Sequence, residues 1–502
     1  NLIASMSVAA GLVCALAAAA AVPIRPARPV QALRRLRASP VAVAAGESAA
    51  AEPRLVGYEN FVRSNPRSDR FGVRSFHHIE FVCGDAATTA ARWCAALGFQ
   101  PVASSSLVTG NRAHSSHVIR SGALTLAFTA PYTDGSDEGS ECPTLLGADG
   151  RRRPAALRDY FDRHGLSACA VALHVDDAHA AFDAAVAGGA EPVTPPRAAP
   201  GGTAPSDGLV LFSEVRLYGD VALRFVSGAP LEQGQLSFLP GYVPAVGTGT
   251  GPAATFGIRA LDHCVGNVPD LLAAVRYLQR ATGFHEFAEF TAEDVGTVDS
   301  GLNSMVLACN SEQVLLPLNE PTFGGRRKSQ IQTYLDQHKG PGVQHLAMRT
   351  DNVFATVRAM RDARGGFALM ERPREEYYAA LRDRLGHDTL TQEQIDECRE
   401  LGILADRDDQ GVLLQIFTRP VGDRSTLFLE IIQRIGCEVQ VPQIGVAEMD
   451  GAPTGGSLPG GAGTAMVAVE QTPGCGGFGK GNFHELFRAI EEYETKAGIN
   501  TV

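Results

Sequence analysis

The chain has 502 residues, of which 45% are hydrophobic and 20% charged, and its formal net charge is -11 at pH 7. This length accommodates roughly two or three domains with sizeable cores, and the composition is that of an ordinary globular protein. The acidic balance, without a basic stripe interleaved with aromatic residues, argues against a nucleic-acid-binding protein. Chemistry on a small molecule is the expected class of function.

The N-terminal segment, residues 1–53, differs in composition from the rest of the chain. It has no acidic residue before Glu47, is rich in alanine and carries its charge on arginine. This composition favours an organelle transit peptide with a plastid as the destination, and a disordered tail on a cytoplasmic protein is the alternative. Secretion is disfavoured, because no basic residue precedes the apolar run Met6–Ala21. No other run is long and apolar enough to span a bilayer, so we expect no membrane partner.

The ten cysteines include no CxxC pair. A disulfide scaffold is implausible in a chain of this length, and a reduced compartment fits better. Zinc sites built from thiolates are disfavoured for the same reason.

Two stretches of the chain begin alike. RSFHHIEFVCGD starts at Arg74 and RALDHCVGNVPD starts at Arg259, so that His78 aligns with His263. An alanine-rich amphipathic pattern follows each stretch and ends at LGF or TGF, where glycine signals the end of a helix. The helices are expected at residues 86–97 and 271–282.

The similarity continues in the second part of each repeat. SACAVALHVDD, from Ser167, aligns with PGVQHLAMRTD, from Pro341, and GDVALRFV aligns with STLFLEII. Without gaps, Val171 falls on His345 and Arg224 falls on Glu430. The pattern predicts an internal duplication of strand–helix–strand modules with additional antiparallel strands, which is an α+β fold with curved mixed sheets.

Three further segments complete the predicted organisation. A stretch rich in Gly and Pro separates the repeats, residues 374–404 are charged and helical and are interpreted as an insertion outside the core, and a Gly/Pro/Ala loop spans residues 450–463. The expected division is an N-terminal extension at 1–53, a domain without metal at 54–230, a linker at 231–255, a catalytic domain at 256–440, and a mobile loop with a C-terminal helix at 441–502.

The segment LFLEIIQR contains a carboxylate within an apolar run. In a strand, Glu430 shares one face with Phe428 and Ile432, which directs a charge toward the core. A buried carboxylate is costly unless a cation meets it. That cation could be an arginine in a core salt bridge or a metal ion.

The duplication distinguishes these two interpretations. The second repeat has His263, His345 and Glu430 where the first has His78, Val171 and Arg224, so only the second can bind a metal. Two histidines and one carboxylate with open positions are typical of non-heme iron oxygenases. The same residues could also hold zinc with a catalytic water, or manganese.

Neutral polar and aromatic side chains accompany these candidate ligands. Together they predict a pocket with amide and hydroxyl donors and aromatic walls, which suits a flat aromatic substrate with an anionic end. Taken singly, each polar residue is better explained by local hydrogen bonding in a turn or at a strand edge. The set is Ser304, Asn319, Gln330, Gln344, Gln415, Phe417, Phe483 and Phe487.

The C-terminal segment CGGFGKGNFHELFRAIEEYE combines flexible glycines with an amphipathic helix. We expect Asn482 to cap a helix that runs to about Tyr493 and presents Phe483, Leu486 and Phe487 on its apolar face. The pattern fits a lid over the pocket, and it fits equally a helix docked permanently on the core.

Several of these motifs together resemble the 4-hydroxyphenylpyruvate dioxygenase family in its plant or algal form. They are GIRALDHCVGNV, DSGLNSMVL, RKSQIQTYL, GVQHLAM, DRDDQGVLLQIFTRP, FLEIIQR and GCGGFGKGNFHELF. The resemblance covers about residues 53–493 and leaves out the N-terminal segment and the loop at 451–463. It implies the vicinal oxygen chelate superfamily, with tandem βαβββ modules that form two open barrels and a C-terminal lid helix.

The resemblance also implies a reaction. Fe(II), one per subunit, is expected at His263, His345 and Glu430, where 4-hydroxyphenylpyruvate and O2 react to give homogentisate and CO2, with roles in tyrosine and phenylalanine catabolism and in plastoquinone and tocopherol supply. Glutamine side chains are expected to orient substrate or water near the metal, Ser304 and Asn319 to bond the phenol end, and phenylalanines to clamp the ring and help the lid to close. The residues assigned to catalysis are Gln330, Gln344, Gln415, Phe417 and Phe483.

Three alternatives accompany this assignment. An enzyme like 4-hydroxymandelate synthase would use the same substrate but oxidise its benzylic carbon. A zinc glyoxalase or isomerase, or a binding protein without catalytic activity, could be built on the same modules. By analogy we expect a homodimer, with a homotetramer as the alternative, in which the first repeat provides scaffold and assembly surface.

Overall fold

A computed structural model of the chain describes residues 53–132, 154–198, 209–245, 255–296, 301–442 and 467–500. The predicted transit peptide and the predicted mobile loop at 450–463 lie outside these residues. Within the described ranges, no helix combines the length and the hydropathy needed to cross a membrane.

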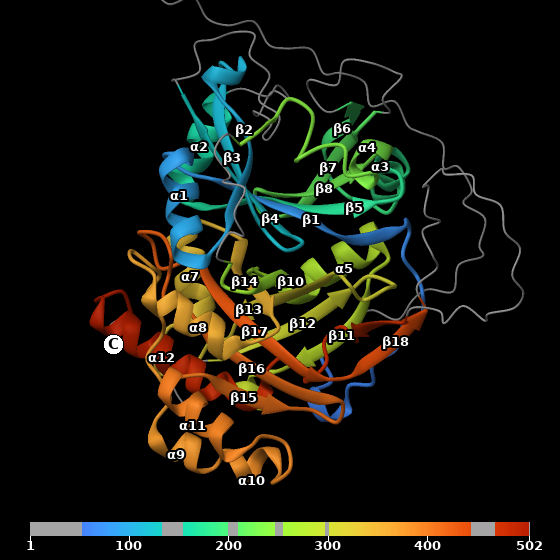
Figure 1. Cartoon of the computed structure of the whole chain (residues 1–502). Coiled ribbons are helices and arrows are strands. Elements are labelled where there is room, and N and C mark those ends of the chain that lie inside the picture. The colour runs from blue at the N-terminus through green and yellow to red at the C-terminus, as the bar shows by residue number, and fades with distance from the viewer. Residues whose placement is uncertain are drawn as a thin grey trace, which may run out of the picture. The chain divides into compact units, whose positions relative to one another are not determined.

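The first half of the chain is organised around a nine-stranded mixed sheet, shown in blue to green in Figure 1. Its strand order is β6-β7-β8-β5-β1-β4-β3-β2-β9, so the first strands of its two modules, β1 and β5, pair antiparallel at the centre. The elements are β1 Val73–Val82, α1 Ala86–Leu97, β2 Gln100–Ser105, β3 His114–Ser121, β4 Leu124–Pro131, α2 Pro154–His164, β5 Ser167–Val175, α3 Ala178–Ala187, β6 Pro192–Ala198, β7 Leu211–Tyr218, β8 Val221–Ser227, α4 Ala229–Glu232 and β9 Val243–Pro244.

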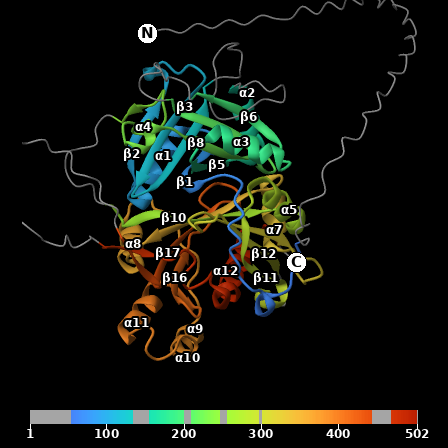
Figure 2. The ribbon, with the colours of Figure 1, turned by 90° about the vertical axis from the view of Figure 1, so that its right-hand side faces the viewer.

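The second half forms an eight-stranded sheet in the order β11-β12-β13-β10-β14-β17-β16-β15, and β18 pairs separately with β19. Figure 2 shows helices α9, α10 and α11 of this half grouped together, in orange. The elements are β10 Ile258–Asn267, α5 Leu271–Thr282, β11 His285–Phe290, α6 Ala292–Val295, β12 Leu302–Ala308, β13 Leu315–Pro321, α7 Gln330–His338, β14 Gly342–Thr350, α8 Val353–Asp362, α9 Glu375–Ala379, α10 Leu381–Leu385, α11 Gln392–Leu401, β15 Leu404–Arg407, β16 Gly411–Phe417, β17 Phe428–Gly436, β18 Glu438–Pro442, β19 Val467–Gln471 and α12 Phe483–Lys496.

Apart from β9, each strand of the first sheet has an equivalent in the second sheet, which confirms the predicted duplicated α+β frame. In each half the first strand of a module is parallel to its last, as β1 is to β4 and β14 is to β17. The two predicted helices, α1 and α5, have the expected bounds, because an aspartate accepts a backbone N–H at each start and a glycine in the left-handed region ends each helix.

The strand register corrects one detail of the alignment. His78 pairs with Ala172 and His263 pairs with Ala347, so the residue equivalent to His345 is Ala170 and the predicted match with Val171 is wrong. The error is one residue, and in a strand one residue reverses the face. Val171 accordingly packs in the main hydrophobic cluster. The match of Arg224 with Glu430 is retained, because these residues pair with Ala172 and Ala347.

Residues 374–404 are helical as predicted, but their exclusion from the core is wrong. Tyr377, Tyr378 and Leu381 are at most 9% exposed and belong to the main hydrophobic cluster. The hydroxyl of Tyr377 donates to Asn482 Oδ1 at 2.8 Å, just before α12. The apolar side chains at helical spacing bury one face of this charged segment, and the charges lie on its other face.

The stretch between the repeats also contributes to packing. β9 pairs with β2 at the edge of the first sheet, and Phe238 is buried against Val118 and Ala127. Phe238 also lies edge-on to His78, with 4.9 Å between ring centroids. The described part of this stretch therefore closes the first barrel, in addition to connecting the two halves.

Cys437 and Cys475 form a disulfide, which contradicts the expectation of reduced thiols for this pair. The pairing joins the end of β17 to the glycine-rich turn before α12, two segments that only the tertiary fold brings together. Free thiols among the other described cysteines include those of Cys83, Cys94, Cys264, Cys309 and Cys398.

Candidate metal centre and substrate cavity

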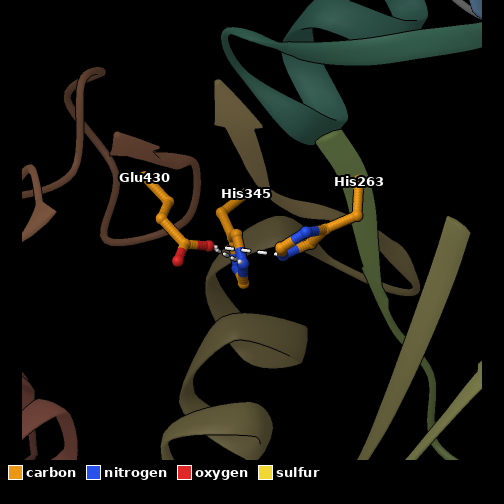
Figure 3. A group of neighbouring side chains, drawn as sticks. All are labelled: His263, His345 and Glu430. Atoms are coloured by element: carbon orange, nitrogen blue, oxygen red, sulfur yellow. Dashed lines mark ion pairs between the residues drawn. The ribbon is translucent and has the colours of Figure 1, made fainter. Parts of the chain in front are cut away.

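Three strands of the second sheet direct His263, His345 and Glu430 to one point (Figure 3). Glu430 Oε2 lies 3.3 Å from His263 Nε2 and 3.4 Å from His345 Nε2, and one potential ligand atom from each residue lies within 4.8 Å of the others. Among the described residues this is the group of histidines and carboxylates whose geometry could hold a metal ion.

Glu430 reaches this point because β17 is a regular strand between β14 and β16. Its neighbours on the same face are Phe428 and Ile432, and all three side chains are buried. Burial alone would raise the pKa of Glu430, but contacts with His263 and His345 lower it to about 2. The carboxylate is therefore ionised, as a metal ligand must be.

A bulge beside each histidine supplies a partner for its second nitrogen. Leu261 pairs with Met348 and His263 pairs with Ala347, so Asp262 is an extra residue in β10. Asp262 Oδ1 lies 2.7 Å from His263 Nδ1. In β14 the extra residue is Gln344, and its Oε1 lies 2.9 Å from His345 Nδ1.

These contacts determine how the histidines can act. A carboxylate or amide oxygen accepts a hydrogen bond, so each Nδ1 carries a proton, and each Nε2 is the nitrogen that faces Glu430 and can bind a metal once it is unprotonated. Burial tends to lower the pKa of His263, but its contacts with Asp262 and Glu430 raise the pKa to about 9. Burial dominates at His345 and lowers its pKa. Two imidazole nitrogens and one carboxylate fit a divalent transition metal with open coordination positions.

A cavity extends from these three side chains. The structure brings every residue that was predicted for the pocket onto its wall. In addition to the three candidate ligands, they are Ser304, Asn319, Gln330, Gln344, Gln415, Phe417, Phe483 and Phe487.

Part of the remaining wall was also expected. Phe428 shares a face with Glu430, and Leu486 and Ile490 lie on the apolar face of the predicted C-terminal helix. Phe478 could have been found, since it lies in the glycine-rich motif before α12. The small and aliphatic strand residues carried no signal, because apolar strand residues look alike whether they face a cavity or a core. The unpredicted residues are Val265, Phe290, Leu302, Val306, Pro317, Phe478 and Gly479.

The polar groups of the cavity differ in how many hydrogen bonds they make with the protein. Gln330 is the first residue of α7 and is 7% exposed, and its Oε1 is buried without a hydrogen-bond partner. Asn319 Nδ2 donates to Asn267 Oδ1 over a long 3.4 Å. Because unsatisfied buried polar atoms are costly, Gln330 is ready to accept a hydrogen bond from a molecule in the cavity.

Helix α12 covers one side of the cavity with Phe483, Leu486, Phe487 and Ile490. It begins after Asn482 and extends to Lys496, beyond the predicted end. The predicted capping role of Asn482 is wrong: its Oδ1 accepts from Tyr377 and Arg384 and caps no helical N–H. These bonds attach the start of the helix to the segment that carries α9 and α10.

Comparison with known proteins agrees with the duplicated fold. The model of the Glyoxalase/Bleomycin resistance protein/Dioxygenase superfamily matches residues 75–206 and 260–414, so the fold and site belong to a tandem member of this class. Among solved structures, a mutant of 4-hydroxymandelate synthase from Streptomyces coelicolor shares the fold with a TM-score of 0.62 at 24% identity, over 84% of this chain and 99% of that one.

Sequence relatives define the family more closely. The chain is 52% identical to 4-hydroxyphenylpyruvate dioxygenase of Plectranthus scutellarioides, over 88% of this chain and 94% of that protein. It is 48% identical to the enzyme of the same name from Arabidopsis thaliana, over 89% and 94% of the two chains. The chain belongs to the 4-hydroxyphenylpyruvate dioxygenase family.

Proposed function

We propose that the chain converts 4-hydroxyphenylpyruvate and O2 to homogentisate and CO2 with one Fe(II) per subunit. The observation that carries the proposal is the convergence of His263, His345 and Glu430 on the wall of a buried cavity, in a chain of this family. The pathway roles that follow are tyrosine and phenylalanine catabolism and the supply of plastoquinone and tocopherol precursors.

The three ligands would hold iron, which supplies adjacent open positions where the 2-oxo acid of the substrate and O2 can meet. The chain's own contribution is orientation of these ligands. Asp262 and Gln344 hold the two imidazole rings through Nδ1, so that both Nε2 atoms lie beside Glu430, where they would bind the ion. With one carboxylate and two neutral histidines, Fe(II) keeps a net positive charge that attracts an anionic keto acid.

The cavity wall would orient the rest of the substrate. We assign Gln330, Gln344 and Gln415 to hydrogen bonds with substrate or water near the metal, and Ser304 and Asn319 to the phenol end. Gln330 Oε1, which has no protein partner, fits a donor on the bound molecule or on an ordered water. Phe417 and Phe483 would hold the ring, and Phe487 would help α12 to exclude water from the reacting atoms.

The test combines metal analysis of the purified protein with oxygen uptake and product chromatography. We expect bound iron, O2 consumption that depends on 4-hydroxyphenylpyruvate, and homogentisate as the product. Formation of 4-hydroxymandelate would replace this function with benzylic oxidation. Turnover of a glyoxalase or isomerase substrate without O2, in a protein that contains zinc, would contradict the proposal altogether. Absence of both metal and turnover would leave a binding protein.

Two further proposals concern assembly and location. A homodimer is expected, with a homotetramer as the alternative, and light scattering that gives a monomer at micromolar concentration would contradict both. The Ala/Arg-rich composition of residues 1–53, without an acidic residue before Glu47, supports plastid targeting. A fusion of these residues to a fluorescent protein tests it, and a cytoplasmic signal in plant or algal cells would contradict it.

A further inference from the structure

A buried arginine outside the cavity contacts both Asp262, the neighbour of a candidate metal ligand, and the turn that leads to α12. Arg434 lies on β17 and is 5% exposed. Its Nε donates to Asp262 Oδ2 at 2.8 Å, and its Nη2 donates to Asp262 Oδ1 at 2.7 Å. Because guanidinium and carboxylate match in a two-point bond, this pair fixes the plane of the Asp262 carboxylate.

Asp262 in turn contacts a predicted metal ligand. The same oxygen, Oδ1, accepts from both Arg434 Nη2 and His263 Nδ1. Asp262 occupies the bulge in β10, where the backbone alone does not determine the direction of the side chain as it does in a regular strand. The position of its carboxylate therefore depends on Arg434.

The remaining nitrogen of Arg434 holds the glycine-rich turn. Nη1 donates to the carbonyl oxygens of Cys475 at 2.5 Å and Gly477 at 2.7 Å. The next residue, Phe478, lines the cavity and lies edge-on to His263, with 5.2 Å between ring centroids. Arg434 is thus the common partner of the residue that orients His263 and of the turn that places Phe478 over it.

We propose that Arg434 is a positioning residue that couples the orientation of His263 to the closed position of the 475–478 turn. The coupling rests on the proposed function, since it assigns a metal to His263. The proposal predicts that loss of the hydrogen bonds of Arg434 changes two properties together. These are the ligand field of a metal bound at His263 and the stability of the turn. The disulfide between Cys437 and Cys475 is a separate tether of this turn, so loss of the Arg434 bonds should loosen the turn without releasing it.

The experiment uses Co(II) as a spectroscopic probe in the full-length protein freed of metal. For Arg434→Gln we expect Co(II) affinity, measured by competition with a chelator, to fall about 10- to 100-fold, which is the usual effect of losing an outer partner of a metal ligand. The visible absorption bands of bound Co(II) should change, and hydrogen exchange at the backbone amides of residues 475–479 should accelerate. Arg434→Lys keeps the charge but not the two-point bond and should give intermediate values in all three measurements.

Unchanged Co(II) affinity and spectrum in Arg434→Gln would show a merely structural role and overturn the proposal. A change at the metal without faster exchange in the turn, or the reverse, would also overturn it, because the coupling requires both. If Arg434→Gln does not fold, Asp262→Asn is measured in the same way and should weaken Co(II) binding while the turn keeps its two bonds to Arg434. Wild-type protein that binds no Co(II) or Fe(II) would instead refute the proposed function.

Discussion

The central strands of the two halves, β1, β5 and β8 in the first and β10, β14 and β17 in the second, pair in the same register, but the halves use the equivalent site differently. In the second half, Glu430 faces two histidines and a cavity. In the first half, Arg224 occupies the position of Glu430 and its Nη1 lies 2.9 Å from His78 Nε2. Arg224 also pairs with Glu80 at 2.8 Å and Glu214 at 2.7 Å, so a guanidinium is the buried cation where the second half could hold a metal ion.

The bulges of the two halves are also equivalent, with different chemistry. His77 takes the place of Asp262, and its Nδ1 lies 2.6 Å from the Nδ1 of His78. Burial lowers the pKa of His77 to about 3, so it stays neutral and adds no negative charge. A carboxylate in that bulge supports a metal ligand, whereas an imidazole does not.

The two halves also differ in the segment that covers the first histidine of the site. Phe238 covers His78 from a segment that is paired into the first sheet, and Phe478 covers His263 from a glycine-rich turn. One aromatic side chain fills a core and the other bounds a cavity. The two halves thus share one fold. A few different buried residues give the first half a packed core at the place where the second half has a cavity and candidate metal ligands.

The largest effect is expected from Glu430→Ala. Loss of one of three ligands should abolish measurable Fe(II) binding and reduce turnover by at least about 10³-fold, roughly 4 kcal/mol in transition-state stabilisation. The protein should still fold, because the equivalent strand of the first half does so without this carboxylate. Isothermal titration with Fe(II) and circular dichroism test both parts. Unchanged Fe(II) affinity would refute the ligand assignment, and Glu438→Ala, which removes an exposed carboxylate nearby, is the matched control.

Arg224→Met tests the first half in the same way. It leaves the buried Glu80 and Glu214 without their shared cation, so we expect the free energy of unfolding to fall by about 3–5 kcal/mol while the Fe(II) affinity of the second half is unchanged. Chemical denaturation measures the loss. The triple variant Glu80→Gln, Glu214→Gln, Arg224→Met removes all three charges and should recover most of it. A triple variant no more stable than Arg224→Met would show that the charges are not the cause.

The same comparison explains what could be predicted from the sequence. Duplicated motifs, the glycines that end the helices at Gly98 and Gly283 and strand alternation at Glu430 are local signals, and the corresponding elements were found at their expected places. The bulges at Asp262 and Gln344 were not found, since an extra residue in a strand is defined by its partner strand. The one-residue error at Val171 has another cause: the alignment matched Asp177 with Asp351, whereas the residue that caps the equivalent helix is Asn352.

Contacts between distant segments were also beyond prediction. Nothing near Arg434 or Cys437 in the sequence indicates the turn at 475–478, because only the fold brings it there. The charged segment at 374–404 was taken for an insertion outside the core because its net polarity obscures one apolar face. By contrast, the candidate ligands and the polar residues of the cavity were predicted from the sequence, and their individual roles remain proposals.

A third prediction concerns the contact between the halves. His164 and His338 end the helices that precede the equivalent strands β5 and β14, and their rings stack with 4.3 Å between centroids. His164 Nε2 lies 3.0 Å from Asp220, whereas His338 Nε2 is buried without a partner. Burial lowers the pKa of His338 to about 4, with additional repulsion from His164.

The unfolded chain binds a proton at His338 near pH 6.5, before the folded chain does. The contribution of neutral His338 to the free energy of unfolding is therefore complete above pH 6.5. It falls by at most about 3 kcal/mol as the pH decreases toward 4. His338→Gln should reduce this loss, which denaturant unfolding at pH 7, 5.5 and 4.5 would measure. An identical pH dependence in wild type and variant would exclude His338 as the titrating group.

The smallest effect is expected at the turn itself, where a pair of glycines gives a matched comparison. Gly479 and Gly477 have φ of +73° and +75°, so alanine at either position is strained by roughly 1–2 kcal/mol. A Cβ at Gly479 would lie 2.5 Å from Gln415 Nε2, whereas at Gly477 the nearest atom is 3.7 Å away. Both variants should be slightly less stable than wild type, but only Gly479→Ala should displace Gln415 in the cavity.

Because Gln415 is assigned to the substrate, kcat/KM should fall about tenfold more for Gly479→Ala than for Gly477→Ala, a difference of roughly 1.4 kcal/mol. Steady-state oxygen uptake measures it alongside thermal unfolding. Equal losses in the two variants would mean that backbone strain alone accounts for the effect. The contact between Gly479 and Gln415 would then serve packing alone and would not help to define the substrate site. In this respect it would resemble the packing of Phe238 in the first half.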